Sequence, residues 1–144
     1  MKPAHFLKQL EHDRIVAAIA SAEKKTSGEI RVLVSHREVA DPVAAAEKAF
    51  LRLKMQNTPH RNAVLIFVAP RSRRFAVIGD QAVHEKCGEA FWSELTAAMT
   101  DHFKSGHFTD GLLHGIARAG ELLAAYFPRD PNSTNHLPDT VIED

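Results

Sequence analysis

Three short apolar runs, rich in β-branched residues, occupy the middle of the chain, at residues 30–35, 63–69 and 75–78. Runs of this length and composition are typical of buried strands. A helical pattern over about residues 43–55 separates the first two runs, so these elements predict a strand–helix–strand unit with parallel strands. Only a short turn separates the last two runs, which predicts an antiparallel hairpin. The centre of the fold should therefore be a small mixed β-sheet.

Helical patterns flank these strands and set the fold class. They cover about residues 11–25, 43–55, 81–104 and 109–127, with apolar residues recurring at helical spacing. Asp41 and Pro42 form an N-cap followed by proline at the first helical position. Gly88 predicts a break in the third helix, and Pro128 ends the fourth. Helices on both faces of the sheet predict an α/β protein, a three-layer α/β/α sandwich with a small mixed β-sheet.

The first long helix is expected to turn one apolar side toward the sheet. Ile15 and Ile19 belong to that side, whereas Glu23 is expected to lie outside it. Gly28 follows the helix and is expected to end it as a left-handed cap. One core should combine residues from strands and helices, namely Ile66, Val77, Phe91, Trp92, Leu95 and Leu112.

The length and composition of the chain suit one soluble domain. We place this domain at residues 4–128 of the 144 and expect the polar, proline-containing residues 129–144 to form an extended or disordered tail. The formal net charge is zero, with 18 basic and 18 acidic residues, which argues against a nucleic-acid partner. No apolar run approaches the roughly 20 residues of a membrane span, and the charged N-terminal sequence lacks a signal-peptide apolar region. We therefore expect no direct membrane span and a cytoplasmic location.

Four stretches, read in order and spacing, resemble the TPM domain family. They are AEKKTSGEIRVLV (22–34), RNAVLIFVAPRSRRFAVIGD (61–80), HEKCGEAFW (84–92) and HFKSGHFTDGLLHGI (102–116). The resemblance covers about residues 10–128, and HLPDTV at 136–141 resembles the ending of the soluble bacterial branch. This family includes the acid phosphatase of the thylakoid lumen and many bacterial proteins of unassigned function.

The resemblance implies an α/β/α sandwich, a weak phosphatase activity, and binding of calcium or other divalent ions through acidic residues. The chain departs from the thylakoid type in two respects. It lacks the signal and transmembrane segments common in many members. It also reads Gly79-Asp80-Gln81 where those members carry a glycine-rich turn. Both departures weaken the transfer of phosphatase activity to this chain.

Four residues are candidate metal ligands, and each has a simpler structural alternative. Asp80 lies between the third strand and a helix, where it either coordinates a hard divalent cation or caps the helix. His84 follows four residues later and would share a helix face with Asp80, or it is solvated. Glu29 begins the first strand and supplies a carboxylate or pairs with a nearby base. Asp110 either joins Asp80 or interacts with the N-terminus of the last helix.

Two further features carry a structural and a functional interpretation. Arg71, Arg73 and Arg74 make a basic hairpin tip that either attracts an anionic partner or is merely solvated. Cys87, the single cysteine, excludes an internal disulfide framework and is expected to be a semi-buried residue of a helix.

The functional expectation is a domain that binds calcium or magnesium, with weak metal-dependent acid phosphatase activity and no organic cofactor. A bound metal would offset phosphate charge and activate water. The catalytic residues are unknown, because no serine, threonine or cysteine stands beside a histidine at a recognisable spacing. The alternative is a non-catalytic adaptor that binds an unknown protein partner at a membrane complex.

Overall fold

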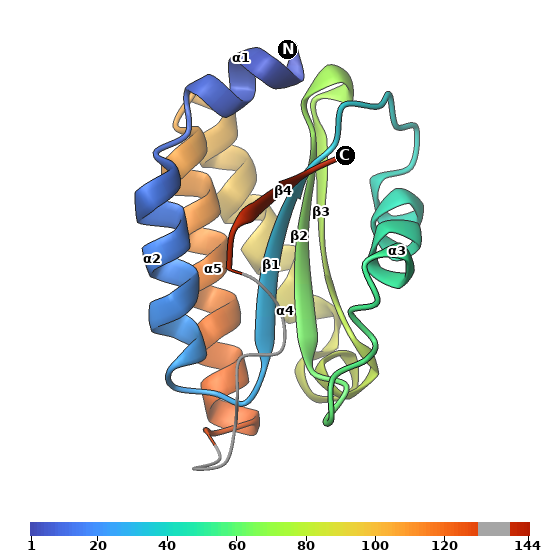
Figure 1. Ribbon diagram of the computed structural model, residues 1–144, viewed down its shortest axis with the longest axis vertical. Coiled ribbons are helices and arrows are strands. Elements are labelled where there is room, and N and C mark those ends of the chain that lie inside the picture. The colour runs from blue at the N-terminus through green and yellow to red at the C-terminus, as the bar shows by residue number, and fades with distance from the viewer. Residues whose placement is uncertain (130–138) are drawn as a thin grey trace.

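The computed structural model describes residues 1–129 and 139–144 and places a four-stranded sheet between two helical layers (Figure 1). The helices are α1 (Pro3–Lys8), α2 (His12–Glu23), α3 (Pro42–Arg52), α4 (Gln81–Lys104) and α5 (Phe108–Tyr126), with a short 3-10 helix η1 (Pro70–Ser72). The strands are β1 (Glu29–Val34), β2 (Ala63–Ala69), β3 (Arg74–Gly79) and β4 (Val141–Glu143). The predicted α/β sandwich is confirmed.

The strand order is β3-β2-β1-β4. β1 and β2 are parallel, with Glu29 opposite Ala63, and α3 connects them as the predicted crossover. β2 and β3 are antiparallel, with Val64 opposite Gly79, which confirms the hairpin. The first residue of β1, the first residue of β2 and the last residue of β3 therefore lie at one edge of the sheet.

Strand β4 was not predicted from the sequence. It pairs in parallel with the second half of β1, where Val141 lies opposite Val32. Beyond this strand, Asp144 accepts a hydrogen bond of 2.6 Å from Arg52 of α3. Residues 130–138, with His136 and most of the HLPDTV segment, lie outside the described residues, so a domain boundary at residue 128 stays a prediction.

Both faces of the central strands are apolar because helices cover both. Alternate residues such as Val32 and Ile66 face the layer of α2, α4 and α5, whereas Leu33 and Phe67 face α3 (Figure 1). This arrangement explains the nearly continuous apolar runs in the sequence. Four of the expected core residues, Ile66, Val77, Leu95 and Leu112, are buried together, and the partly buried Phe91 and Trp92 pack against them.

Two helix boundaries have the local causes expected from the sequence. Asp41 caps α3, where its side chain accepts hydrogen bonds from the backbone of Val43 and Ala44 at 3.1 and 3.2 Å. Gly88 interrupts α4 with φ of 71° and ψ of 171°, a conformation that glycine adopts at low cost. Within the described ranges, no helix combines the length and apolar character needed to cross a membrane.

Two expectations at the end of α2 were wrong. Glu23 is buried with 7% exposure, because it follows Ile15 and Ile19 at intervals of four residues and shares their inward face. Gly28 is not a left-handed cap, since it has no positive φ. It is required instead by close packing, because a Cβ atom there would lie 3.0 Å from both the Asn62 carbonyl oxygen and a Leu123 methyl group.

The same leucine-to-alanine substitution, made once at a buried and once at an exposed position, tests this core directly. Leu33→Ala removes a side chain with 0% exposure, whereas Leu51→Ala removes one with 60% exposure. We expect Leu33→Ala to lower the free energy of unfolding by ~2–5 kcal/mol and Leu51→Ala to change it by less than ~0.5 kcal/mol. Urea denaturation measures both, and equal losses would contradict the placement of β1 in the core.

Candidate functional site

Three carboxyl groups gather where β1 begins. Glu23 is the last residue of α2, Glu29 is the first residue of β1, and Asp139 comes shortly before β4. Glu23 and Glu29 are 7% and 2% exposed. The Oε2 atom of Glu23 accepts a hydrogen bond of 2.8 Å from the Ile30 backbone. We call Glu23, Glu29 and Asp139 the carboxyl cluster.

The environment of Glu23 raises its pKa from 4.5 to about 10. Burial is the largest cause, followed by a side-chain hydrogen bond with Asp139, and the adjacent Glu29 adds a further hydrogen bond and a like charge. The hydrogen bond from Ile30 favours the charged form and only partly opposes these effects. Glu23 is therefore a neutral carboxylic acid at neutral pH.

Two guanidinium groups lie beside the carboxyl cluster. Arg31 of β1 is 9% exposed, and burial lowers its pKa while the charges of Glu23 and Glu29 oppose that shift. Arg129 donates a hydrogen bond of 3.1 Å to the backbone carbonyl of Glu23. Loss of the Glu23 proton would place a negative charge beside Glu29 in a buried environment.

Asp80 lies at the same edge of the sheet and acts as a helix cap. Its side chain accepts a hydrogen bond of 2.8 Å from the Gln81 backbone, which confirms the capping role. Its two carboxylate oxygens also accept hydrogen bonds of 2.7 and 2.9 Å from Arg61. In turn, Asp80 raises the pKa of Arg61 through the hydrogen bonds and its negative charge. The Asp80 backbone donates to the carbonyl of Ala63, which places β2 between Asp80 and Glu29.

The other two candidate ligands, His84 and Asp110, are placed differently with respect to Asp80. His84 is exposed one helical turn later, and its backbone donates to the Asp80 carbonyl. Asp110 lies in the first turn of α5, beside Thr109, whose hydroxyl contacts the start of α2 at Glu11. α5 is 19 residues long, and its other end meets the segment before β1, where the Ser27 backbone donates to the Phe127 carbonyl. In residues 1–129 and 139–144, no three His, Cys, Asp or Glu side chains are arranged to hold a metal ion.

A sequence model of the TPM domain matches residues 1–122. The chain belongs to the TPM domain family. The BA42 protein of the psychrophilic bacterium Bizionia argentinensis, solved by NMR, is 40% identical with a TM-score of 0.85, and the match covers 93% of this chain and 92% of that one. No curated protein matches the chain.

A more distant solved structure shares the fold of this TPM domain. It is the N-terminal domain of a protein from P. gingivalis, with a TM-score of 0.60 and 17% identity over 84% of this chain and 76% of that one. At this identity the match supports the fold alone.

Sequence reasoning named Glu29 but missed the rest of the carboxyl cluster and its cations. The signal for Glu23 was present, because the spacing 15, 19, 23 puts it on the buried face of α2. Arg31 also gave a signal as a charged residue inside an apolar strand. Asp139 gave none, because its position depends on the pairing of β4 with β1, which joins segments over 100 residues apart.

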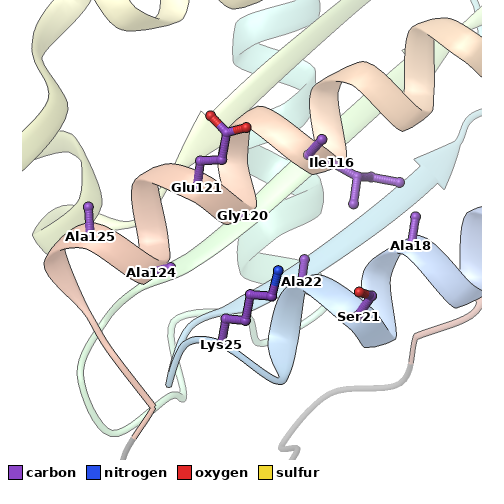
Figure 2. Close-up of a pocket in the computed structure, with 10 residues that line it drawn as sticks. Ala18, Ser21, Ala22, Lys25, Ile116, Gly120, Glu121, Ala124 and Ala125 are labelled. Carbon is purple, nitrogen blue, oxygen red and sulfur yellow. The ribbon is translucent and has the colours of Figure 1, made fainter.

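The TPM domain also has a groove between α2 and α5, with a volume of about 660 Å³ (Figure 2). Its lining is mainly alanine and glycine, and Gly120 lets the two helices approach so closely that a Cβ there would lie 2.8 Å from Ala22. Two charged residues, Lys25 of the segment after α2 and Glu121 of α5, also line the groove, and Figure 2 shows Lys25 extending toward it. This groove offers apolar surface rather than reactive groups.

Cys87 is not activated as a nucleophile in this TPM domain. Burial raises the pKa of its thiol, which is the opposite of the shift that a reactive cysteine needs. The thiol is free, in agreement with a semi-buried residue of a helix.

The raised pKa of Glu23 predicts a pH dependence of stability. Between pH 4.5 and 10 the folded chain holds a proton that the unfolded chain has lost, so this group makes stability fall as pH rises. Glu23→Gln keeps an acceptor for Ile30 and has no proton to lose. In the presence of a chelator, we expect the free energy of unfolding of wild type to fall relative to Glu23→Gln by up to ~1.4 kcal/mol per pH unit between pH 6 and 8. A constant difference over this range would show that Glu23 titrates normally.

Proposed function

We propose that this TPM domain binds a divalent cation, with Ca²⁺ preferred, through Glu29, Glu23 and Asp139. The observation that supports this proposal is the gathering of two buried carboxyl groups and the half-buried Asp139, where burial and these neighbours raise the pKa of Glu23 to about 10. A buried carboxyl group retains a proton in this way when no sufficient positive charge compensates it. A cation can take the place of that proton.

The chemistry of these oxygens suits calcium better than a transition metal. Carboxylates are hard ligands, and Ca²⁺ accepts six to eight oxygens in flexible geometry, with water completing the shell. Because the described side chains do not already form a three-ligand site, binding would require the carboxyl groups to draw together and Glu23 to ionise. Such a site is expected to be of modest affinity.

Asp80 is a less favourable cation ligand than the carboxyl cluster. Both of its oxygens already accept from Arg61, and one of them also caps α4. A cation there would have to displace a guanidinium group and a backbone hydrogen bond together. At the carboxyl cluster a cation would displace the Glu23 proton and rearrange the existing contacts of the three carboxyl groups.

Thermal unfolding with increasing Ca²⁺ tests the position of the site. A cation that binds only the folded chain raises the melting temperature, and the rise continues with the logarithm of the cation concentration above the Kd. We expect this rise in wild type and in Asp80→Asn and Asp110→Asn, and its loss in Glu29→Gln. Loss in Asp80→Asn with retention in Glu29→Gln would assign the cation to the cap of α4 instead.

Proton release tests the role of Glu23 independently of stability. Calorimetric titration with Ca²⁺ in buffers of different ionisation enthalpy should show close to one proton released per ion at pH 7. The apparent affinity should rise by up to about tenfold per pH unit below the pKa of Glu23. Glu23→Gln should release no proton. Binding without proton release in wild type would contradict a site that includes Glu23.

The proposal also includes a weak, metal-dependent phosphatase activity. A bound cation would offset the charge of a phosphate group. Turnover of p-nitrophenyl phosphate that requires Ca²⁺ or Mg²⁺ and is lost in Glu29→Gln would support it.

The groove between α2 and α5 favours a second candidate function, a non-catalytic interaction module. Its small apolar side chains offer a contact surface without chemistry. A folded chain that responds to cations but shows no turnover with any metal would reject the enzyme and support this candidate.

A further inference from the structure

The end of the molecule at the β2–β3 hairpin carries a cluster of arginines and lysine from three chain segments. We call Lys2, Arg37, Arg71, Arg73 and Arg74 the basic tip. All five are exposed, and none forms an ion pair with a residue that the structure describes. In the segments 1–2, 35–39 and 70–74 that form the tip, Glu38 is the single acidic residue.

Hydrogen bonds that involve the N-terminus and two side chains fix the three segments to one another. The Met1 nitrogen lies 3.2 Å from the Pro70 carbonyl, and the Val39 backbone donates to the Ser72 hydroxyl at 2.7 Å. Arg71 donates through Nε to the His36 carbonyl at 2.8 Å, so the rest of its guanidinium group stays available. Arg73 closes the turn in a left-handed conformation with φ of 50°. The cations therefore stand on a pre-organised platform, which lowers the entropy lost on binding an anion.

The basic tip has more cations than acidic neighbours. Asp144 is already paired with Arg52, and the five cations outnumber the nearby Glu38 and Glu143. Because the whole chain has zero formal net charge, a surplus of cations at this end implies a surplus of anions elsewhere. The zero net charge thus conceals a polarised molecule, and it does not argue against an anionic partner.

We propose that the basic tip binds the phosphate groups of an anionic phospholipid surface. The tip lies with the N-terminus at one end of the molecule's longest axis, so a plane that approaches this end meets the hairpin together with the neighbouring helix α1 (Figure 1). Its cations are spread over three segments, which suits a two-dimensional array of phosphates, and the exposed Met1 side chain lies beside them. Arginine matches phosphate with paired N–H donors. This contact would hold the protein at a membrane surface without a membrane span.

Co-sedimentation of the full chain with vesicles tests this proposal. We expect binding to vesicles that contain phosphatidylglycerol, little binding to pure phosphatidylcholine, and loss of binding at high salt. The double variant Arg73→Asn/Arg74→Gln should bind roughly 30-fold more weakly, the factor that corresponds to ~1 kcal/mol for each removed charge. Asparagine is chosen at residue 73 because it tolerates a left-handed backbone.

Matched variants keep the test decisive. Lys48→Gln/Lys86→Gln removes two exposed charges from α3 and α4 and should bind as wild type does. If the arginine variant fails to fold, Lys2→Gln/Arg37→Gln removes two charges from the other segments of the tip and should weaken binding equally. Equal binding to both vesicle types, or equal loss in tip and control variants, would overturn the proposal. Binding to soluble polyglutamate but not to anionic vesicles would overturn it in favour of an acidic protein partner.

Discussion

Strand β1 is buried along its whole length, yet β4 pairs with only its second half. A buried backbone N–H without a partner costs free energy comparable to a lost hydrogen bond. At the start of β1, the carboxyl group of Glu23 accepts from Ile30 and takes the place of the missing strand. This substitution explains why an acidic residue lies on the buried face of α2. It also explains why a proton is retained there, because a buried carboxylate beside Glu29 is disfavoured as an ion.

A structural role for Glu23 and a cation site are compatible. An amide or a hydroxyl group could accept from Ile30 equally well, and either would avoid the cost of burying an acid next to a second acid. The gathering of Glu29 and Asp139 around Glu23 is not needed to complete the backbone hydrogen bonding of β1. The structural role explains why Glu23 is buried, and the proposed cation would use the two carboxyl groups that lie beside it.

The parts of this fold that local sequence controls were predicted well, and the parts that long-range pairing controls were not. The crossover, the hairpin, the Asp41 cap and the break at Gly88 each depend on neighbouring residues. The role of Asp80 was predicted in part: its capping function follows from the strand–helix junction, but its partner Arg61 lies 19 residues earlier. That pair forms because the hairpin register brings the end of β3 to the start of β2. Strand β4 and Asp139 depend on contacts across most of the chain, which no local pattern encodes.

The carboxyl cluster and the basic tip lie at opposite ends of β1, and their separation limits how they can influence each other. Six residues of strand span about 20 Å, more than twice the Debye length of about 8 Å at physiological ionic strength. Direct electrostatic coupling between the carboxyl cluster and the basic tip is therefore weak. Strand β4 offers a mechanical connection instead, because Asp139 precedes it and Asp144 follows it. The Asp144 carbonyl accepts from the backbone of His36, next to Arg37 of the tip. If both proposals hold, a bound cation would influence the tip by changing how firmly β4 is held against β1.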